Sequence, residues 1–358
     1  MRLAKRIASR RYARSARLGD GQKRHLCMTK TTLSKPGGPQ EVGILVYPGS
    51  QLAAVYGLTD LFVIANRIAC ERQVSVSPVL VVSHWALTSK GQRVERIFCT
   101  DGTGTGNPTV LIVPPTLGAA PAKDDAATVS RWLKRQYAEG TTLTSVCAGA
   151  FLLAETGLLA GRSVTTHWSY VDSLVERFPE LQVKGEELVI DEGDIITAGG
   201  LMAWIDLGLR LVERLVGTTI MAETARFLLV DPPGREQRHY SRFLPRLQHG
   251  DKAILRVQRW LTKCSAQDVN LASMSAIAGL SDRTFQRRFH KVTGLSPLEY
   301  CQNLRINRAR ELLEFQGGSV ESIAYSVGYF DVNVFRKVFR KITGLSPSEY
   351  RKRFRIDR

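Results

Sequence analysis

Cysteine is scarce in this chain of 358 residues, and the six that occur show no paired spacing. The sequence shows neither a disulfide framework nor a Cys-x-x-Cys zinc motif. We therefore expect a reduced, cytoplasmic protein with no structural metal and no cofactor. The six are Cys27, Cys70, Cys99, Cys147, Cys264 and Cys301.

Long uninterrupted apolar runs are also lacking. The most apolar segment, 146–161, contains Glu155 and is shorter than the ~20 residues that a helix needs to span a bilayer. Residues 1–40 do not contain the long apolar core of a secretory signal peptide. We therefore expect no membrane-spanning segment.

Acidic residues are too few to balance the basic residues at either end of the chain. The net charge is +17, from 50 basic and 33 acidic side chains. Residues 1–40 hold eleven Lys or Arg and one acid, residues 253–358 hold nineteen and nine, and the segment between has a net charge of −3. Two basic ends around a slightly acidic middle are expected where the ends meet phosphate and the middle does not.

The basic segment 1–40 has little apolar periodicity and ends near a Pro-Gly-Gly sequence at 36–38. Three interpretations remain open: a disordered arm that contacts DNA, a targeting segment, or an extension upstream of a true start at Met28. Of these we favour a disordered tail without an essential function.

The stretch from Leu271 to Tyr350 contains one pattern twice. Thr-Gly-Leu-Ser-Pro occurs at 293–297 and again at 343–347, with Glu-Tyr close behind in both copies. Two copies are too few for a solenoid, so a duplicated compact unit is predicted. Five residues recur at a spacing of 50: Phe285, Phe289, Gly294, Pro297 and Tyr300 return as Phe335, Phe339, Gly344, Pro347 and Tyr350.

Each copy predicts a short helix, a glycine turn and a second helix. The second helix opens at Ser281 or Asp331, both good N-cap residues, and its apolar stripe faces the core. The remaining side chains face outward, where Arg, Gln and Asn can contact base edges in the major groove. One such helix is more simply a solvated charged face, but two matched copies favour a pair of DNA-binding helix-turn-helix units. The predicted DNA-contacting residues are Arg283, Gln286, Arg287, His290, Asn333, Arg336, Lys337 and Arg340.

Residues 298–315, between the copies, predict one helix of about 27 Å at ~1.5 Å per residue. That length is near the ~34 Å repeat of B-DNA, so the two second helices would enter successive major grooves. On the twin Thr-Gly-Leu-Ser-Pro segments and their tyrosines, the region 254–354 resembles the DNA-binding domain of AraC/XylS-type transcription regulators. The resemblance implies a monomeric unit with two helix-turn-helices, usually in an activator.

Between residues 42 and 229, apolar runs alternate with helical patterns. This alternation argues for a doubly wound α/β domain with a largely parallel sheet. The isolated His84, His239 and His249 are expected at the surface or at helix caps. Strands are predicted at 42–47, 79–82, 109–113, 143–146, 164–166, 189–190 and 195–198, and helices at 52–69, 130–137, 203–216 and 221–229.

The strand at 143–146 runs directly into Cys147 and a small-residue helix start, which is the layout of a nucleophile elbow. A helix N-terminus there would lower the thiol pKa, and His167 ends a later strand that could face the thiol. With Tyr47-Pro48-Gly49 and Ala198-Gly199-Gly200, these segments resemble the ThiJ/PfpI superfamily. More narrowly, residues 41–358 resemble GlxA-type regulators, in which such a domain precedes an AraC-type one.

Two positions differ from the residues expected in catalytic members of the ThiJ/PfpI superfamily, which the sequence resembles. Ala54 stands where many members have a carboxylate that supports the cysteine. Pro114-Pro115 replaces a glycine pair that helps form the oxyanion hole, and proline has no N–H to donate. Losing one oxyanion donor costs a hydrolase roughly 100- to 1000-fold in rate. We therefore expect no enzyme, and interpret five residues as lining a ligand pocket: Cys147, Ala148, His167, Gly199 and Gly200.

The expected organisation is a basic disordered tail (1–40), a ThiJ/PfpI-like ligand-sensing α/β domain (41–230), a polar linker (231–252) and an all-α domain with two helix-turn-helix units (253–358). The expected function is a sequence-specific transcription regulator, an activator, that responds to a small metabolite. Expected partners are double-stranded promoter DNA, RNA polymerase, a small-molecule effector and a second copy bound through the N-terminal domain. Two alternatives are a cysteine-dependent amidase or hydratase with a DNA-binding domain, and a passive nucleoid-binding protein.

Overall fold

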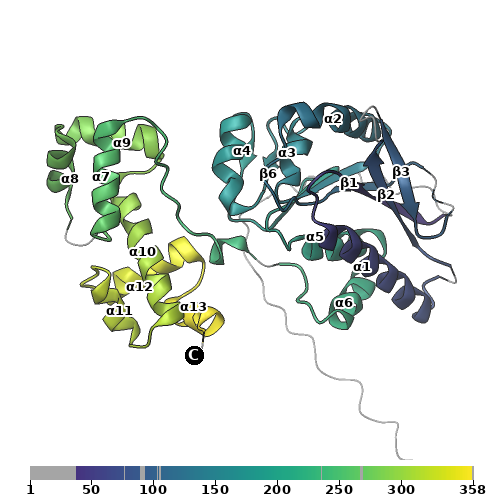
Figure 1. Cartoon of the computed structure of the whole chain (residues 1–358). Coiled ribbons are helices and arrows are strands. Elements are labelled where there is room, and N and C mark those ends of the chain that lie inside the picture. Colours follow the sequence, from purple (N-terminus) through teal and green to yellow (C-terminus); the bar gives the residue numbers. More distant parts are fainter. Residues whose placement is uncertain are drawn as a thin grey trace, which may run out of the picture. The chain divides into compact units, whose positions relative to one another are not determined.

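The computed structural model describes residues 38–356 except 76, 89–92, 103, 105, 235 and 267–268, and describes no side chains for 123–125. The predicted tail lies outside the described residues apart from its last three positions. The described chain forms a sheet-bearing N-terminal domain and a helical C-terminal domain, which Figure 1 shows.

A seven-stranded sheet forms the centre of the N-terminal domain. Five neighbouring strands run parallel in the order β2-β1-β4-β5-β9, while β3 and β8 pair antiparallel at the two edges. The predicted doubly wound, largely parallel sheet is confirmed. Its strands are β1 (Gln40–Val46), β2 (Leu80–Leu87), β3 (Val94–Cys99), β4 (Val110–Val113), β5 (Thr142–Val146), β8 (Val189–Asp191) and β9 (Ile195–Ala198).

Helices cover both faces of the sheet because the central strands are apolar on both sides. One core packs the sheet against α1 (Leu52–Glu71), α5 (Trp204–Leu215) and α6 (Thr218–Phe227). The opposite core packs it against α2 (Lys123–Ala138), α3 (Gly149–Ala154) and α4 (Val171–Arg177), and Figure 1 shows the two layers. Helix α1 is long and apolar enough to cross a membrane, yet nine of its side chains are buried within the domain.

Several features of this domain differ from the sequence prediction, helix α4 and strand β7 among them. The segment predicted as a strand at 164–166 contributes only β6 (Ser163–Val164), which pairs with β7 (Gln182–Val183) in a separate two-stranded sheet. Strand β3 was not predicted because it lies at an edge and its exposure does not alternate. His84 is buried rather than exposed, since its Nε2 bonds Thr59 Oγ1 at 2.8 Å and its ring packs on Phe98.

The C-terminal domain consists of seven helices within the described residues. Its long central helix α10 contributes to two separate cores: Tyr300 and Cys301 join the first, while Ile306 and Leu313 join the second. The duplicated sequence therefore folds as two compact halves that share one helix. The helices are α7 (Lys252–Lys263), α8 (Leu271–Ala278), α9 (Asp282–Thr293), α10 (Pro297–Phe315), α11 (Val320–Ser326), α12 (Val332–Thr343) and α13 (Pro347–Phe354).

Candidate functional site

Each half of the C-terminal domain is a helix-turn-helix. In the first, α8 ends at Gly279, whose left-handed conformation (φ 67°, ψ 38°) is favourable for glycine and turns the chain into α9. In the second, Gly328 (φ 83°) has the same role between α11 and α12. Asp331 then caps α12 by accepting from Asn333 N at 2.7 Å and Val334 N at 3.3 Å. Ser281 is the N-cap residue of α9, as predicted, although its hydroxyl bonds the Thr284 side chain.

Helices α9 and α12 present matched inner and outer faces. Phe285 and Phe289 of α9 are completely buried, as are Phe335 and Phe339 of α12. Each helix therefore has its outward side fixed by two large core side chains. All eight residues predicted to contact DNA lie on those outward sides and are exposed: Arg283, Gln286, Arg287, His290, Asn333, Arg336, Lys337 and Arg340.

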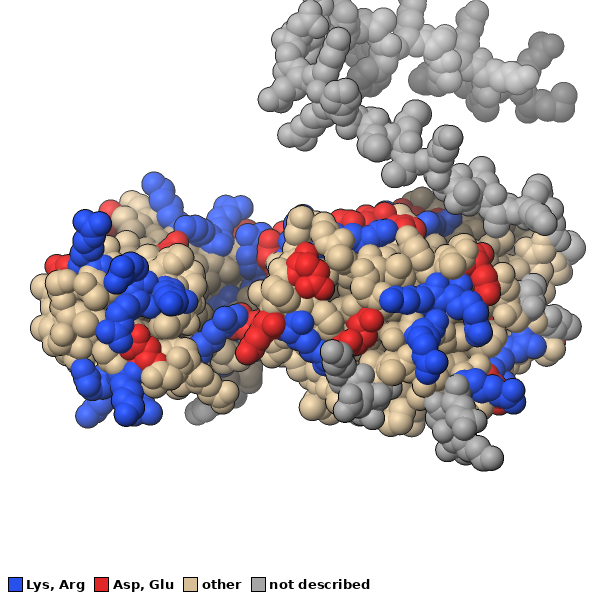
Figure 2. All heavy atoms as spheres, turned by 90° about the horizontal axis from the view of Figure 1, so that it is seen from above, with Lys and Arg blue, Asp and Glu red and all other residues tan. Residues whose placement is uncertain are grey.

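Not every arginine near these helices is free to contact DNA. Arg288 of α9 is turned back and forms an ion pair with Asp251, the N-cap of α7. Arg336 of α12 forms an ion pair with Glu321 of α11 at 2.6 Å, but both side chains are about half exposed, so solvent weakens this contact. Figure 2 shows Lys and Arg side chains clustered on the visible face of the helical domain.

The cysteine elbow lies where β5 meets α3, at the carboxyl ends of the parallel strands. Cys147 has a positive φ of 54°, a strained conformation for a residue with a side chain. An added Cβ on Gly149 would lie 2.5 Å from the Val113 carbonyl oxygen, so only glycine fits behind the turn. Burial raises the pKa of the Cys147 thiol to about 11, although the Ala148 and His167 backbones oppose this shift. The sequence argument that a helix terminus lowers this pKa is thus outweighed by desolvation.

Two groups that would support a catalytic thiol, a carboxylate and a backbone N–H donor, are replaced in this sequence by Ala54 and by Pro114-Pro115. Ala54, at the position of the missing carboxylate, is fully buried in α1. The carbonyl oxygens of the two prolines point into the turn as acceptors: Pro114 O accepts from Tyr47 Oη at 2.6 Å, and Pro115 O accepts from Gln51 N at 2.7 Å. Proline has no N–H and a carbonyl oxygen cannot donate, so neither residue supplies the donor that an oxyanion needs.

His167 lies next to the elbow, but its ring is engaged elsewhere. Its Nδ1 lies 2.7 Å from Ser169 Oγ, and its ring stacks on Trp168 with centroids 5.2 Å apart. Burial lowers the pKa of this histidine, so the neutral form is favoured. The His167 backbone contributes to the thiol environment, and the neighbouring Thr166 hydroxyl donates to the Cys147 carbonyl oxygen at 2.8 Å.

The remaining predicted pocket residues have different surroundings. Ala148 is fully buried. Gly199 faces Gln237, a residue of the predicted linker, and an added Cβ would lie 2.4 Å from the Gln237 side-chain nitrogen. Gly200 is partly exposed. The structure therefore places Cys147 and His167 beside each other. Gly199 instead leaves space for the Gln237 side chain, which the sequence analysis did not single out. We call the place where this side chain is bound its seat.

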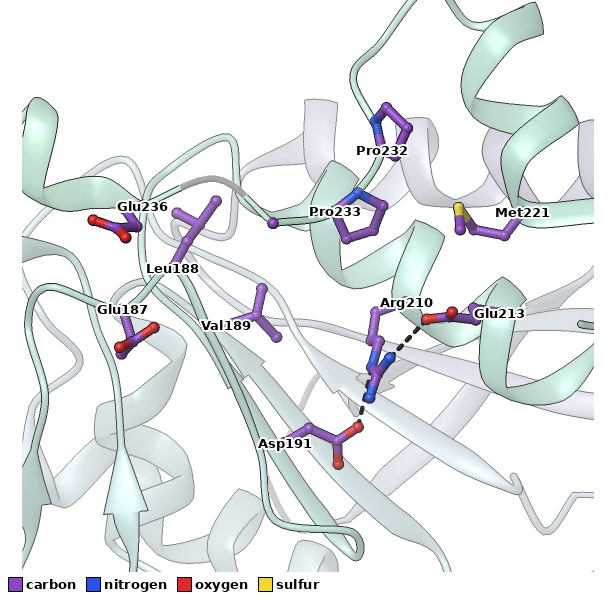
Figure 3. A pocket seen from close by; sticks show the side chains of 11 residues that line it. Glu187, Leu188, Val189, Asp191, Arg210, Glu213, Met221, Pro232, Pro233 and Glu236 are labelled. Atoms are coloured by element: carbon purple, nitrogen blue, oxygen red, sulfur yellow. Dashed lines mark hydrogen bonds and ion pairs between the residues drawn. The ribbon is translucent and has the colours of Figure 1, made fainter. Parts of the chain in front are cut away.

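A cavity of about 490 Å³ is bounded by β8, α5, α6, residues 232–234 and Glu236 (Figure 3); Glu187, which also contacts Gln237, is among its lining residues. At its side Arg210 extends between Asp191 and Glu213, bonding them at 3.2 and 2.6 Å. No local sequence pattern marks this cavity, because its walls come from four distant segments. The residues that line it are Glu187, Leu188, Val189, Asp191, Arg210, Glu213, Met221, Pro232, Pro233, Gly234 and Glu236.

Two protein families match successive parts of the chain. The DJ-1/PfpI family matches residues 68–214, which contain the cysteine elbow. A helix-turn-helix domain family matches residues 274–353, which contain α9 to α12.

Curated relatives include proteins with both parts. The HTH-type transcriptional regulator GlxA of Rhizobium meliloti is 26% identical over 81% of this chain and 89% of its own length. The HTH-type transcriptional regulator GbdR of Pseudomonas aeruginosa is 24% identical over 81% of this chain and 78% of its own. An isonitrile hydratase of Pseudomonas putida is 38% identical, but over only 30% of this chain and 46% of the enzyme. The chain thus combines a part that matches the DJ-1/PfpI family with a part that matches a helix-turn-helix domain family, and over most of its length it is similar to HTH-type transcriptional regulators such as GlxA, as the sequence resemblance predicted.

Proposed function

We propose that this chain is a sequence-specific, DNA-binding transcription regulator whose N-terminal domain responds to a small metabolite. The observation that carries the proposal is the pair of exposed polar faces on α9 and α12, each fixed by two fully buried phenylalanines. Arginine, glutamine and asparagine are the side chains that read guanine and adenine edges in the major groove.

The spacing of the two faces supports simultaneous contact with DNA. Helix α10 has 19 residues and joins the two halves, so it spans about 28 Å at ~1.5 Å per residue. Successive major grooves on one face of B-DNA are ~34 Å apart. A rigid helix of this length would hold α9 and α12 at neighbouring grooves, and each half would read a few base pairs.

A selection from random double-stranded DNA tests this function with the purified full chain. We expect enrichment of a defined sequence, and DNase I protection of that sequence at physiological salt. A chain that binds all sequences with equal affinity would instead be the passive nucleoid-binding protein, and the proposal would fail. Replacing exposed Arg308 of α10 by Ala provides a control that removes one surface charge without touching either outward face.

In the N-terminal domain, we infer that the elbow is a sensing element rather than a catalytic centre. A neutral thiol, a histidine turned toward Ser169 and proline carbonyls in place of oxyanion donors make a poor hydrolase. The variant Cys147→Ser removes the nucleophile and nearly conserves volume. We expect it to keep regulated transcription and expect no turnover of amides, nitriles or glyoxals by the wild type. Turnover that disappears in Cys147→Ser would favour the amidase or hydratase alternative.

The effector has two candidate places. One is the pocket originally predicted at Cys147, Ala148, His167, Gly199 and Gly200. The other is the cavity of about 490 Å³, which lies within the usual size of small-molecule sites. Its lining combines an apolar floor with four carboxylates and one guanidinium, so it would favour a cationic metabolite.

The other expected partners follow from a regulatory function. We propose that the chain works in the cytoplasm as an activator, contacts RNA polymerase at promoters and forms a homodimer through its N-terminal domain. Sedimentation of the full chain in the absence of DNA would test the dimer directly.

A further inference from the structure

One glutamine of the predicted linker is buried in the N-terminal domain. Gln237 is 2% exposed, although the segment around it is polar. Its Nε2 donates to Thr166 O at 2.8 Å, Glu187 O at 3.0 Å and Thr165 Oγ1 at 3.1 Å. Its Oε1 accepts from Trp168 N at 3.2 Å. Both ends of the carboxamide are therefore bound, mostly by backbone groups, as a ligand is bound in a site that recognises amides.

The seat for this side chain depends on a glycine. An added Cβ on Gly199 would lie 2.4 Å from Gln237 Nε2 and 2.8 Å from its carboxamide carbon. Gly199 itself does not have a positive φ among the described glycines, so its backbone permits a larger residue. Glycine is therefore needed at position 199 to leave space for the Gln237 side chain, and not to allow a special backbone conformation.

The residues that follow Gln237 are held by the C-terminal domain. His239 Nδ1 lies 2.8 Å from the carbonyl oxygen of Thr343, the last residue of α12. Arg310, a fully buried residue of α10, donates to the carbonyl oxygens of Arg238 and Ser241. A segment of five residues, 237–241, is thus bound to one domain through the Gln237 side chain. It is bound to the other domain through the His239 side chain and two backbone carbonyl oxygens.

The amide seat is also connected to the cysteine elbow. It is built largely by residues 165–168, which include His167, and the Thr166 hydroxyl donates to the Cys147 carbonyl oxygen at 2.8 Å. Any movement of 165–168 changes the hydrogen-bond partners of Gln237. Glu187 also lines the cavity of about 490 Å³, so a molecule bound there would lie beside a residue whose carbonyl oxygen accepts from Gln237.

We propose that Thr165, Thr166, Trp168, Glu187 and Gly199 form a carboxamide-binding site that the chain fills with its own Gln237. This intramolecular ligand fastens the linker to the sensing domain. This idea rests on the proposed function: the contact also links the elbow and the cavity to α10 and α12, because release of Gln237 would leave the segment attached only to the C-terminal domain, through Arg310 and His239.

Limited trypsin digestion of the full chain tests the site, with cleavage after Arg238 and Arg242 followed by mass spectrometry. Cleavage in a structured segment is proportional to the population of its open form when closing is fast. We expect Gln237→Ala to raise the cleavage rate at these two positions about tenfold or more. Gln248→Ala, which changes an exposed glutamine of the same linker, should leave the rate unchanged.

Gly199→Ala gives an independent test, because it fills the seat and leaves the linker sequence intact. It should raise linker cleavage as Gln237→Ala does, and the double variant should show no further increase, since both changes remove the same contact. Gln237→Glu should behave like Gln237→Ala despite its similar volume, because a carboxylate cannot donate to the three acceptors.

Wild-type cleavage rates in Gln237→Ala and Gly199→Ala, or fully multiplicative effects in the double variant, would overturn the proposal. Circular dichroism of each variant excludes unfolding as the cause of faster cleavage. DNA selection with the same proteins separates the two ideas: loss of sequence preference in the wild type would refute the regulatory function, whereas the cleavage result concerns the amide site alone.

Discussion

Arg288 of α9 and Asp251, the N-cap of α7, are joined by two hydrogen bonds, from Nε to Oδ2 at 3.0 Å and from Nη2 to Oδ1 at 2.7 Å. Oδ1 also accepts from the N–H groups of Ala253 and Ile254 at 3.2 Å each. One carboxylate thus caps α7 and anchors α9. The adjacent Arg287 is exposed, so two neighbouring arginines have separate roles.

These two arginines predict opposite outcomes for the same substitution. Arg287→Ala should weaken binding to the selected DNA by ~1–3 kcal/mol and relax preference at one base pair, with an unchanged melting temperature. Arg288→Ala should lower stability by about 1 kcal/mol, because the pair is partly solvent-screened, and should leave base preference intact. Thermal unfolding and DNA titration of both variants measure the contrast. Equal effects of the two substitutions on affinity would show that the outward face of α9 is misassigned.

The same ion pair predicts a dependence on pH. Burial alone would raise the pKa of Asp251, but its hydrogen bonds to Arg288 and to backbone N–H groups hold the pKa below its usual value. A depressed carboxyl pKa stabilises the fold above the unfolded pKa of ~3.9. That contribution is lost as the pH falls through the folded pKa. Unfolding of the C-terminal half should therefore steepen below about pH 4 in the wild type and less so in Asp251→Asn; identical acid profiles would rule this out.

The two cores of the C-terminal domain predict the cost of truncating their aromatic centres. Phe289 and Phe339 are completely buried, each packed edge-on against a tyrosine. Replacing either by Ala should cost roughly 3–5 kcal/mol and unfold its half. Val334→Ala, on the exposed side of α12, serves as the control and should shift stability by less than ~0.5 kcal/mol. A wild-type melting profile for either phenylalanine variant would be inconsistent with this packing.

The buried thiol predicts slow alkylation. With a pKa of about 11, Cys147 has about one thiolate in a thousand or fewer at pH 8. Iodoacetamide should therefore modify exposed Cys70 far faster than Cys147, and the rate at Cys147 should rise with pH up to that pKa. Peptide mass spectrometry over a time course gives both rates. Faster modification of Cys147 at neutral pH would indicate an activated nucleophile and would revive the enzymatic alternative.

The fold of the C-terminal half could be predicted from the sequence because the same apolar pattern occurs twice at a fixed spacing, whereas its DNA-contacting residues stay a prediction. Phe285 and Phe335 fix the inner faces, and the outward residues follow from helical geometry. The fold of the N-terminal domain could also be predicted from the sequence, since apolar runs alternate with helical patterns. Gln237 could not be predicted, because one glutamine in a polar segment carries no periodic signal. The prediction that His84 lies at the surface or at a helix cap was wrong. Its burial depends on a hydrogen bond with Thr59, which is distant in the sequence and comes close only in the folded chain.

The central claim is that α9 and α12 read DNA as two separate units on successive grooves. Hydroxyl-radical footprinting of the full chain on its selected sequence should show two protected windows about one helical turn apart, on one face. Arg287→Ala should weaken one window and Lys337→Ala the other. A single protected window would contradict the account. So would the loss of both windows together in each variant, or protection that does not depend on the DNA sequence.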